Sequence, residues 1–487
     1  NDMVNDSRGV KTGDVFCAVI GSQGDGRQFI EQAIVNGASI VIAQCLHHHQ
    51  HGNILSKTVS NNGVEQTIEI VQFYLLNEKL SELASLYYGE PLAKLKTIGV
   101  TGTNGKTSTC QIIANLLNLC QQSCALIGTT GAGQLNDLAP ISNTTPGPTE
   151  LNRLFAEFVR YGNSHVAMEV SSHALDQFRI NAEMLDVAVF TNLSRDHLDY
   201  HSTMDDYAQA KFKIFANETL NPKTSQIAII NGDDDIGKKW LTEFKSPVIV
   251  YGQSEQIKQS KNYLWASEIT LDISGVSFVA HTSTEKVRIK SDLLGEFNVE
   301  NLLASIATVH ALGYLLTDIA QAIPAIKPSQ GRMESFIQHE LAMTVVDYAH
   351  TPDALENALT ACRHHCEGEL WVVFGCGGDR DKGKRAQMGQ IAEQYADHVI
   401  VTNDNPRSEA PELIANDILS GCKHTEKVKV MLERAQAVRS TIAHAKAQDV
   451  VLLAGKGHEN TIEINGEIIE YSERALVQSI YQKGVSA

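Results

Sequence analysis

Short apolar runs alternate with segments of helical periodicity along nearly the whole chain of 487 residues. This alternation is typical of α/β proteins, in which helices cover a largely parallel sheet. In the first part of the chain, the pattern predicts strands over residues 15–20 and 39–43 and a helix over 78–88. Gly89-Glu90-Pro91 ends this helix, so we place the first domain boundary near residue 92.

The second part of the chain continues through repeated strand–helix units. Apolar runs predict strands over 97–101, 165–170 and 187–191, and helical periodicity predicts helices over 108–119 and 298–313. Strand-like alternation over 263–290 predicts antiparallel hairpins. Two prolines and a glycine within 324–331 disfavour regular structure and predict a second linker.

The third part alternates in the same way and predicts strands over 344–348, 370–374, 398–402 and 450–453. Such a series predicts a doubly wound sheet of the Rossmann-like type. The length also suggests about three domains at roughly 150 residues each. We therefore predict an α/β fold with an N-terminal domain over 1–92, a central domain over 93–331 and a C-terminal Rossmann-like domain over 332–487.

Composition narrows the class of partner. The chain has 57 acidic and 40 basic side chains, a net charge of −17, which argues against a nucleic-acid partner. No apolar run approaches the roughly 18 residues of a membrane span, and the nine cysteines form no Cys-x-x-Cys pair. We expect a cytoplasmic protein without membrane insertion, and a monomer. The sequence begins at Asn1, so we also expect a short preceding segment.

The strongest local signal is Thr101-Gly102-Thr103-Asn104-Gly105-Lys106-Thr107, between a predicted strand and a predicted helix. Glycines in this context let backbone N–H groups converge on phosphate oxygens at a helix N-terminus. Lys106 would reach the terminal phosphates, and the Thr107 hydroxyl would hold Mg²⁺. The strict pattern has glycine where this chain has Val100, so a simple glycine-rich turn is the alternative.

Polar residues follow other predicted strands. Glu169 ends the strand over 165–170, where a second Mg²⁺ ligand would be natural. His197 is either a metal ligand or a structural hydrogen-bonding histidine. Lys211, taken alone, is interpreted as a solvated surface lysine. The run His47-His48-His49-Gln50-His51 is interpreted as a solvated loop rather than a metal site, because it has no carboxylate or thiol nearby.

Three polar loops follow strands of the third part. The loop from Gly375 to Arg385 is rich in glycine and carries four cations, which suits an anionic ligand better than a neutral ring. Asp404-Asn405-Pro406-Arg407 offers a carboxylate and a guanidinium, either for an amino acid's two charged groups or as a surface turn. Gly455-Lys456-Gly457-His458-Glu459 is the third loop. We expect all three at one edge of the sheet.

Together these stretches resemble the Mur ligase family over essentially all 487 residues. The resemblance rests on an ordered series of motifs rather than on any one of them. They are Asp6-Ser7-Arg8, Thr101–Thr107, Asn143-Thr144-Thr145-Pro146, Glu169-Val170-Ser171-Ser172-His173, Asp196-His197, residues 207–211, Gly331-Arg332, Asp347-Tyr348-Ala349-His350 and residues 455–459.

The resemblance implies an ATP-dependent ligase of peptidoglycan precursor synthesis. In such enzymes ATP phosphorylates the D-glutamate γ-carboxylate of UDP-MurNAc-L-Ala-D-Glu, and an amine then attacks the acyl phosphate. The Asp404 turn resembles the family version that adds meso-2,6-diaminopimelate. The expected partners are these small molecules, with Mg²⁺ as the cofactor and ATP as the co-substrate.

The resemblance also assigns roles to residues. Lys106, Glu169, His197, Lys211 and Arg332 would be catalytic, with Lys211 carbamylated and ligating Mg²⁺ beside Thr107, Glu169 and His197. ATP would contact Gly102, Thr103, Asn104, Gly105, Lys106, Thr107, Ser108, Asn298, Asn301, Arg332 and His350. The UDP-MurNAc-dipeptide would contact Asn5, Ser7, Ser22, Gln23, Gly24, Asn143, Thr144, Thr145, Ser171, Gln177 and Arg179. Diaminopimelate would contact Arg380, Asp404, Asn405, Pro406, Arg407, Gly455 and Glu459.

Four alternatives stay open. The chain could add lysine instead of diaminopimelate, or it could be a folylpolyglutamate synthase, which shares the ATP site. A regulatory ATPase would leave the Lys211 segment and the Asp404 turn unexplained. An NAD-dependent oxidoreductase would rest on the Gly375 loop alone, which lacks the third glycine of the dinucleotide fingerprint.

Overall fold

The computed structural model describes residues 1–21, 24–61, 64–194, 200–215, 226–244, 248–272, 275–328 and 330–483. The chain forms two compact units. The first comprises Asn1–Trp265, His281–Glu285 and Asn301–Ile319, and the second comprises Ala266–Ala280, Lys286–Glu300 and Ala320–Ala487. Within the described ranges, no helix has the length and apolar character needed to cross a bilayer.

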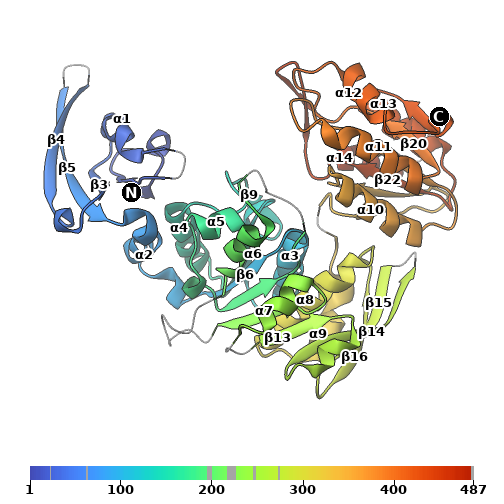
Figure 1. Ribbon diagram of the computed structural model, residues 1–487, viewed down its shortest axis with the longest axis horizontal. Coiled ribbons are helices and arrows are strands. Elements are labelled where there is room, and N and C mark those ends of the chain that lie inside the picture. Colours follow the sequence, from blue (N-terminus) through green and yellow to red (C-terminus); the bar gives the residue numbers. More distant parts are fainter. Residues whose placement is uncertain are drawn as a thin grey trace. The chain divides into compact units, whose positions relative to one another are not determined.

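A five-stranded sheet begins the first unit, in the order β1-β2-β3-β5-β4. Its strands are β1 (Met3–Val4), β2 (Val15–Ala18), β3 (Ile40–Cys45), β4 (Ile54–Asn61) and β5 (Val64–Tyr74), with helices α1 (Ile30–Val35) and α2 (Leu76–Tyr87) (Figure 1). Only β4 runs antiparallel to its neighbour among the described pairs. The predicted strands and helix of this part are confirmed, with ends that differ by one or two residues.

An eleven-stranded sheet follows, in the order β16-β15-β14-β13-β12-β11-β6-β10-β7-β8-β9. Strands of the first unit are β6 (Lys96–Thr101), β7 (Cys124–Gly128), β8 (Gly131–Gln134), β9 (Asp137–Ala139), β10 (His165–Glu169), β11 (Val187–Phe190), β12 (Ile227–Asn231) and β13 (Val248–Gly252). Its helices are α3 (Lys106–Leu119), α4 (Pro148–Arg160), α5 (Ser172–Asp176), α6 (Met204–Phe212) and α7 (Asp235–Leu241). Every residue of β10 and β11 is buried, which explains their continuous apolar runs.

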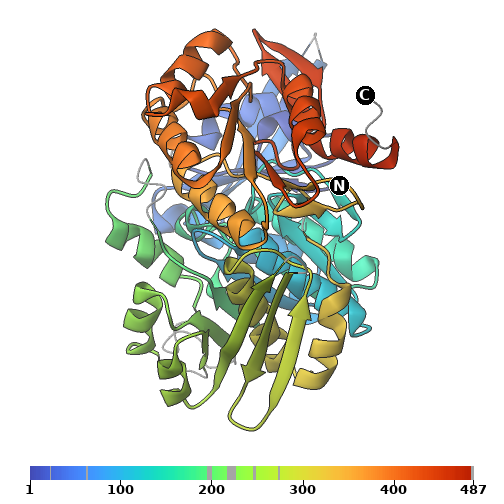
Figure 2. The same cartoon turned by 90° about the vertical axis from the view of Figure 1, so that its right-hand side faces the viewer.

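The stretch predicted to form hairpins contains three strands. They are β14 (Tyr263–Asp272), β15 (Gly275–His281) and β16 (Lys286–Ser291), which lie side by side in chain order (Figure 2, yellow-green). Helices α8 (Phe297–Ala311) and α9 (Leu316–Ala322) follow, and a short 3₁₀ helix, Ile323–Ala325, occupies the start of the predicted linker.

The second unit contains a six-stranded sheet in the order β17-β18-β22-β19-β20-β21. Its strands are β17 (Glu334–Phe336), β18 (Met343–Asp347), β19 (Leu370–Phe374), β20 (His398–Val401), β21 (Val428–Val430) and β22 (Val450–Ala454). All pairs are parallel except β17 with β18. The helices are α10 (Pro352–His364), α11 (Gly383–Tyr395), α12 (Pro411–Leu419), α13 (Arg434–His444) and α14 (Glu473–Lys483).

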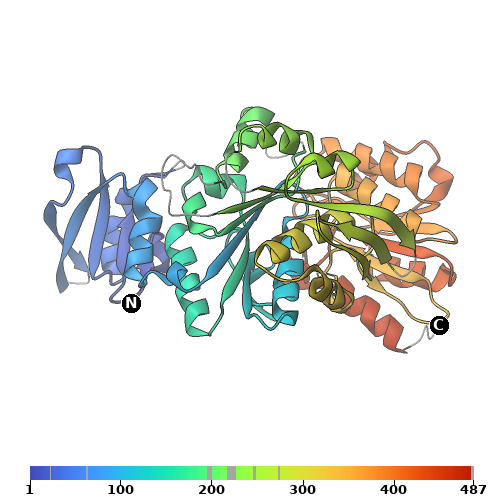
Figure 3. The ribbon, with the colours of Figure 1, turned by 90° about the horizontal axis from the view of Figure 1, so that it is seen from below.

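Apolar side chains cover both faces of this sheet. One core cluster includes Leu359, Met388 and Ile418 from α10, α11 and α12, and another includes Val438 and Val477 from α13 and α14. Figure 3 shows the strands between orange helices on one side and the red helix α14 on the other. A two-stranded ribbon, β23 (Thr461–Ile464) and β24 (Glu467–Glu470), follows β22. The predicted doubly wound arrangement positions the loops after β19, β20 and β22 at one edge.

Candidate active site

The glycine-rich loop after β6 requires glycine at two positions. Gly102 has φ +153° and Gly105 has φ +83°. A Cβ atom at Gly102 would lie 1.9 Å from Thr191 Oγ1, and one at Gly105 would lie 2.5 Å from Asn301 Oδ1. Val100, which replaces the strict pattern's glycine, is a fully buried residue of β6. The replacement of glycine by Val100 therefore lies in the strand and does not alter the conformation of the glycine-rich turn.

Helix α3 begins directly after this loop. Its first intrahelical bond joins Thr109 N to Gly105 O, so the amides of Lys106, Thr107 and Ser108 precede the hydrogen-bonded ladder. Lys106 Nζ donates to the carbonyls of Gly102 at 2.9 Å and Thr103 at 2.8 Å. This end of the helix therefore combines backbone donors with a positive charge, as an anion site requires.

Asn192, to which no sequence motif assigns a role, organises the glycine-rich loop. Its backbone carbonyl accepts from Thr103 N at 2.9 Å, and its side-chain Oδ1 accepts from Asn104 N at 2.9 Å. The neighbouring Thr191 hydroxyl donates to Asn104 O at 2.6 Å. These contacts come from the segment after β11, nearly ninety residues away, and no local motif indicates them.

Glu169 is placed against the loop by sheet register. It is buried, and it pairs in register with Val100 of the neighbouring parallel strand β6. One carboxylate oxygen accepts from Thr107 Oγ1 at 3.0 Å and from Thr129 N at 2.8 Å, and the other accepts from Thr129 Oγ1 at 3.2 Å. A buried carboxylate beside a threonine hydroxyl provides the oxygen ligands that Mg²⁺ prefers. Thr129 is a second residue that the sequence did not indicate.

Lys211 is not the solvated surface residue that its type suggested. It is 1% exposed, its Nζ donates to Gly102 O at 2.7 Å, and it lies 4.5 Å from the centre of the Tyr207 ring. The interpretation from residue type alone was wrong, because the last turn of α6 packs against the glycine-rich loop at Gly102. His197 lies outside the described residues. Among the described residues, no group of three or more His, Cys, Asp or Glu side chains is arranged to hold a metal ion.

Thr145 and side chains that follow β10 form a connected polar cluster. The buried Thr145 hydroxyl donates to Glu169 O at 2.8 Å and accepts from Ser171 N at 3.1 Å. Arg179 donates to Thr145 O at 3.1 Å and twice to Gln177 Oε1, at 3.0 and 2.6 Å. Burial lowers the pKa of Arg179 below its ordinary value. Four of the residues expected at the dipeptide are therefore joined by hydrogen bonds, and Thr145 links them to Glu169.

The remaining residues expected at the dipeptide and at the nucleotide sugar are more dispersed. Thr144 lies 3.2 Å from Thr129 between hydroxyl oxygens, and Asn143 is exposed. Asn5 Oδ1 accepts from Thr149 Oγ1 of α4 at 3.1 Å, and Ser7 donates to Gln32 at 3.1 Å. The Gly24 carbonyl accepts from Gly21 N at 2.9 Å. Ser22 and Gln23 lie outside the described residues.

Two asparagines that we expect to contact ATP lie on α8. The Asn301 amide oxygen accepts from Thr109 Oγ1 at 3.3 Å, within the first unit. Asn298, one turn earlier, belongs to the second unit and donates to Leu294 O at 2.8 Å.

The second unit brings Arg332 beside Tyr348, with 4.8 Å between the guanidinium carbon and the ring centre. Arg332 Nε and His458 Nδ1 are buried and have no hydrogen-bond partner among the described residues. Burial raises the pKa of Asp347, which accepts from Met333 N and Ala349 N. His350 is exposed. Buried nitrogens are normally hydrogen-bonded, so this cluster is a candidate contact for a polar ligand.

The predicted edge of the C-terminal sheet carries a buried charge cluster. Lys456 has no exposed surface, and its Nζ lies 2.6 Å from Glu459 Oε2, 3.1 Å from Asn405 Oδ1 and 3.9 Å from Asp404 Oδ1. Burial alone would raise the pKa of Glu459, but the hydrogen bond and charge of Lys456 hold that pKa below its ordinary range. Lys456 was part of the motif but had been given no role.

Arg407 is also engaged within the protein. It has φ +51°, its Nη1 donates to Gly378 O at 2.8 Å, and its Nε lies 3.3 Å from Glu463 Oε2. Arg380 is exposed.

Three of the four cations in the Gly375 loop contact protein groups. Arg385 and Lys382 pair with Glu409, and Lys384 donates to His350 O.

Sequence comparisons identify all three parts of the chain. The Mur ligase family catalytic domain matches residues 3–88, the Mur ligase middle domain matches 100–309, and the Mur ligase glutamate ligase domain matches 331–457. The chain belongs to the Mur ligase family. The three-domain α/β architecture implied by the resemblance is therefore confirmed.

Two relatives are close to this Mur ligase. It is 44% identical over 477 residues to the UDP-N-acetylmuramoyl-L-alanyl-D-glutamate--2,6-diaminopimelate ligase of Vibrio vulnificus, covering 98% of this chain and 93% of that protein. A solved structure of a ligase with the same name is 33% identical, with a TM-score of 0.71, and covers 100% of this chain and 95% of the other. A folylpolyglutamate synthase from Mycobacterium tuberculosis is 17% identical, with a TM-score of 0.59 over 77% of this chain and 91% of its own, and shares the fold alone.

Proposed function

We propose that this Mur ligase joins meso-2,6-diaminopimelate to the D-glutamate γ-carboxylate of UDP-MurNAc-L-Ala-D-Glu, consuming ATP and releasing ADP and phosphate. The observation that carries the proposal is the 44% identity, over 98% of the chain, to the Vibrio vulnificus ligase of that name. The Asp404 turn beside Lys456 and Glu459 supports the choice of amino acid. We place this reaction in the cytoplasm and in a monomer, as the family resemblance implies.

The chemistry follows from the reactants. A free carboxylate is too poor an electrophile to form an amide at neutral pH, so ATP first converts it to an acyl phosphate. The diaminopimelate amine then attacks the carbonyl carbon, and the tetrahedral intermediate expels phosphate. Lys106 and the amides of the α3 N-terminus hold the transferring phosphoryl group.

The Thr107 hydroxyl and the Glu169 carboxylate, 3.0 Å apart, fit Mg²⁺. When bound, the ion offsets the negative charge on the transferring phosphate. Carbamylation of Lys211 by CO₂ would replace a buried ammonium with an anion in this cluster, and His197 would complete the ligand set. The burial of Lys211 beside Gly102 supports this role.

The other substrates lie around these groups. Arg179, with Thr144, Thr145, Ser171, Gln177 and Asn143, would bind the dipeptide, and Asn5, Ser7 and residues 22–24 would bind the uridine diphosphate. Asn298 and Asn301 would contact adenine. Arg332 and His350 are also assigned to ATP, and the buried Arg332 Nε, which has no hydrogen-bond partner among the described residues, is available to an acceptor.

Diaminopimelate would bind at Arg380, Asp404, Asn405, Pro406, Arg407, Gly455 and Glu459. Its distal carboxylate would form an ion pair with Arg407 in place of Glu463. Its distal ammonium would bind the carboxylates that contact Lys456 in this structure. Lysine lacks the distal carboxylate and would leave Arg407 with its internal partner only.

The decisive experiment measures phosphate release from ATP with UDP-MurNAc-L-Ala-D-Glu across a panel of amino acids. We expect release that depends on meso-diaminopimelate and a ligated product of the corresponding mass. Equal or faster turnover with L-lysine would show the lysine-adding alternative. Turnover with a reduced folate and glutamate, and none with the UDP-linked dipeptide, would show a folylpolyglutamate synthase. Release without any amino acid would show an ATPase only.

A further inference from the structure

A fully buried ion pair lies under the loops after β20 and β22. The side chains of Arg434, at the start of α13, and Glu473, at the start of α14, are 1% and 0% exposed. Arg434 Nε and Nη2 donate to the two oxygens of Glu473 at 2.9 and 3.0 Å. The Tyr471 hydroxyl donates to the same carboxylate at 3.2 Å.

The other donors of Arg434 hold two backbone carbonyls. Nη1 donates to Asn403 O at 2.9 Å, and Nη2 donates to Ala454 O at 2.9 Å. These carbonyls come directly before Asp404 and Gly455, the first residues of the two loops. A Cβ atom at Gly455 would lie 2.7 Å from Asp404 Oδ2, so the loops approach each other closely where Arg434 joins them.

We propose that Arg434 is a positioning residue for the amino-acid site, which fixes the spacing of the Asp404 and Gly455 loops and thereby the affinity for diaminopimelate. The inference rests on the proposed function for the identity of the amino acid. Arg434 belongs to the second unit, whereas the glycine-rich loop at residues 101–107 belongs to the first. Replacement of Arg434 should therefore weaken the binding of diaminopimelate and leave the binding of ATP and the UDP-linked dipeptide nearly unchanged.

Physical chemistry explains why arginine is needed here. A planar guanidinium presents five donors in a fixed fork, and four of its contacts bridge one carboxylate and two carbonyls. Burial alone would lower the pKa of Arg434, but the charge of Glu473 outweighs it and holds that pKa above its ordinary value. A lysine at this position would keep the charge but could not span both carbonyls.

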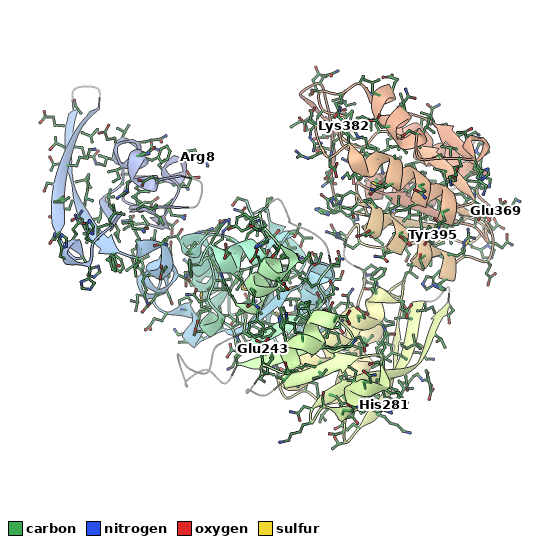
Figure 4. All side chains as sticks on the ribbon, in the orientation of Figure 1. Arg8, Glu243, His281, Glu369, Lys382 and Tyr395 are labelled. Atoms are coloured by element: carbon green, nitrogen blue, oxygen red, sulfur yellow. The ribbon has the colours of Figure 1, made fainter. Side chains whose placement is uncertain are left out.

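The same unit offers a control arginine at the opposite ends of these strands, with a similar set of partners but a side chain that is 40% exposed. Arg363 also contacts one carboxylate and two carbonyls, namely Asp397 at 2.6 Å, Tyr395 O at 3.4 Å and Gly368 O at 3.5 Å. Figure 4 shows Glu369, beside this contact, and Lys382, in the loop after β19, at opposite ends of the unit. Loss of Arg363 should disturb the fold without reaching the amino-acid loops.

The test compares Arg434→Lys, Arg434→Met/Glu473→Leu and Arg363→Met with the unaltered enzyme. The double variant replaces both charges by apolar groups of similar size, a change that is often neutral for stability. We expect the diaminopimelate KM to rise about 10-fold or more in both Arg434 variants, because small displacements of binding groups cost that much. The KM values for ATP and the UDP-linked dipeptide should stay within about twofold, and Arg363→Met should change none of the three.

Hydrogen exchange provides a readout that does not depend on the substrate. The backbone amides of residues 403–407 and 454–459 should exchange faster in the Arg434 variants. Their exchange rates should be unchanged in Arg363→Met. An unaltered diaminopimelate KM in either folded Arg434 variant would overturn the proposal, as would equal rises in all three KM values. If the double variant does not fold, Arg434→Lys decides. If the unaltered enzyme does not ligate diaminopimelate, the proposed function is wrong. The amide hydrogen-exchange rates then still show whether Arg434 holds the two loops in place.

Discussion

Buried lysines illustrate how much a single residue depends on its surroundings in this Mur ligase. Lys211 and Lys456 are 1% and 0% exposed, and each lies against polar groups supplied by distant segments. Lys211 contacts the phosphate loop, and Lys456 contacts the carboxylates of the amino-acid site. An unpartnered ammonium would be costly in either place, so each is expected to do chemistry or to balance charge.

Lys211→Ala should nearly abolish ligation, because the anionic group that carbamylation would provide is lost from the Mg²⁺ site. Short carboxylic acids such as acetate should restore part of the rate by occupying the vacated space. The rate is measured as phosphate release with and without acetate. Lys213→Ala is the control, since Lys213 is 48% exposed and pairs with Asp176. Full activity of Lys211→Ala in CO₂-free buffer would refute the carbamate.

Arg407→Ala should raise the diaminopimelate KM sharply and leave ATP and UDP-dipeptide binding nearly unchanged. It should also narrow the preference over lysine, which can reach about 10⁴-fold when a site is built to hydrogen-bond a group that the wrong substrate lacks. The measurement is kcat/KM for both amino acids in both proteins. Glu463→Gln is the matched variant, because it weakens the internal partner of Arg407 at 3.3 Å while keeping the guanidinium. An unchanged ratio in Arg407→Ala would show that this residue does not recognise the distal carboxylate.

At the scale of elements, strand register places the chemistry. Glu169 comes opposite Val100 because β10 pairs in parallel with β6, and this brings the carboxylate to the start of α3. In the second unit, β19, β20 and β22 are neighbours or next neighbours in one parallel sheet, so their following loops share an edge. Short helices such as α6 then carry single side chains to these edges, and their stability depends on their caps.

Thr203→Ala should destabilise the protein by about 1 kcal/mol through loss of the N-cap of α6. The Thr203 hydroxyl accepts from Asp206 N at 3.1 Å, at the beginning of the helix that carries Lys211. Urea unfolding should show a lower midpoint, while the ligation rate stays within about twofold, because Lys211 is also held by Gly102 O. Thr203→Ser keeps the hydroxyl and should behave like the unaltered protein. Equal midpoints for the alanine and serine variants would contradict the capping role.

At the scale of the whole molecule, the polyanionic substrates that we propose would have to bind a protein with a net charge of −17. Positive charge is therefore concentrated locally, at Lys106 and Arg179 in the first unit and at Arg332 and Arg407 in the second. The residues proposed for ATP and for the UDP-linked dipeptide differ, so the two ligands should stabilise the protein through different residues.

Saturating ATP analogue should raise the apparent melting temperature by a few degrees, since ligand at 100 times its Kd contributes about 2.7 kcal/mol. Lys106→Ala should lose most of this shift, because its ammonium no longer meets the phosphates. The shift produced by the UDP-linked dipeptide should persist in the variant. Differential scanning fluorimetry with each ligand alone measures both effects. Loss of both shifts together would indicate a folding defect rather than a nucleotide-binding role.

The sequence by itself determined many of the strands and helices and the order of the three parts matched by the family models. Predicted strands such as 370–374 match the observed Leu370–Phe374, and most others differ by one or two residues. These strands are buried on both faces of the sheet, so each appears in the sequence as an uninterrupted apolar run. The glycine-rich turn before α3 was also predictable, because its glycines, lysine and helix start are contiguous in the chain.

Only the tertiary structure decided which polar residues are buried and what they contact. Lys211 meets Gly102 across 109 residues, and Arg434 meets Asn403 and Ala454 across 31 and 20. Thr129 and Asn192 likewise act through partners on other strands. A side chain's type records what it can bind, but its burial and partners depend on which distant segments the sheets bring beside it. Local periodicity carries no information about that pairing, because every such contact joins elements that are far apart in the chain.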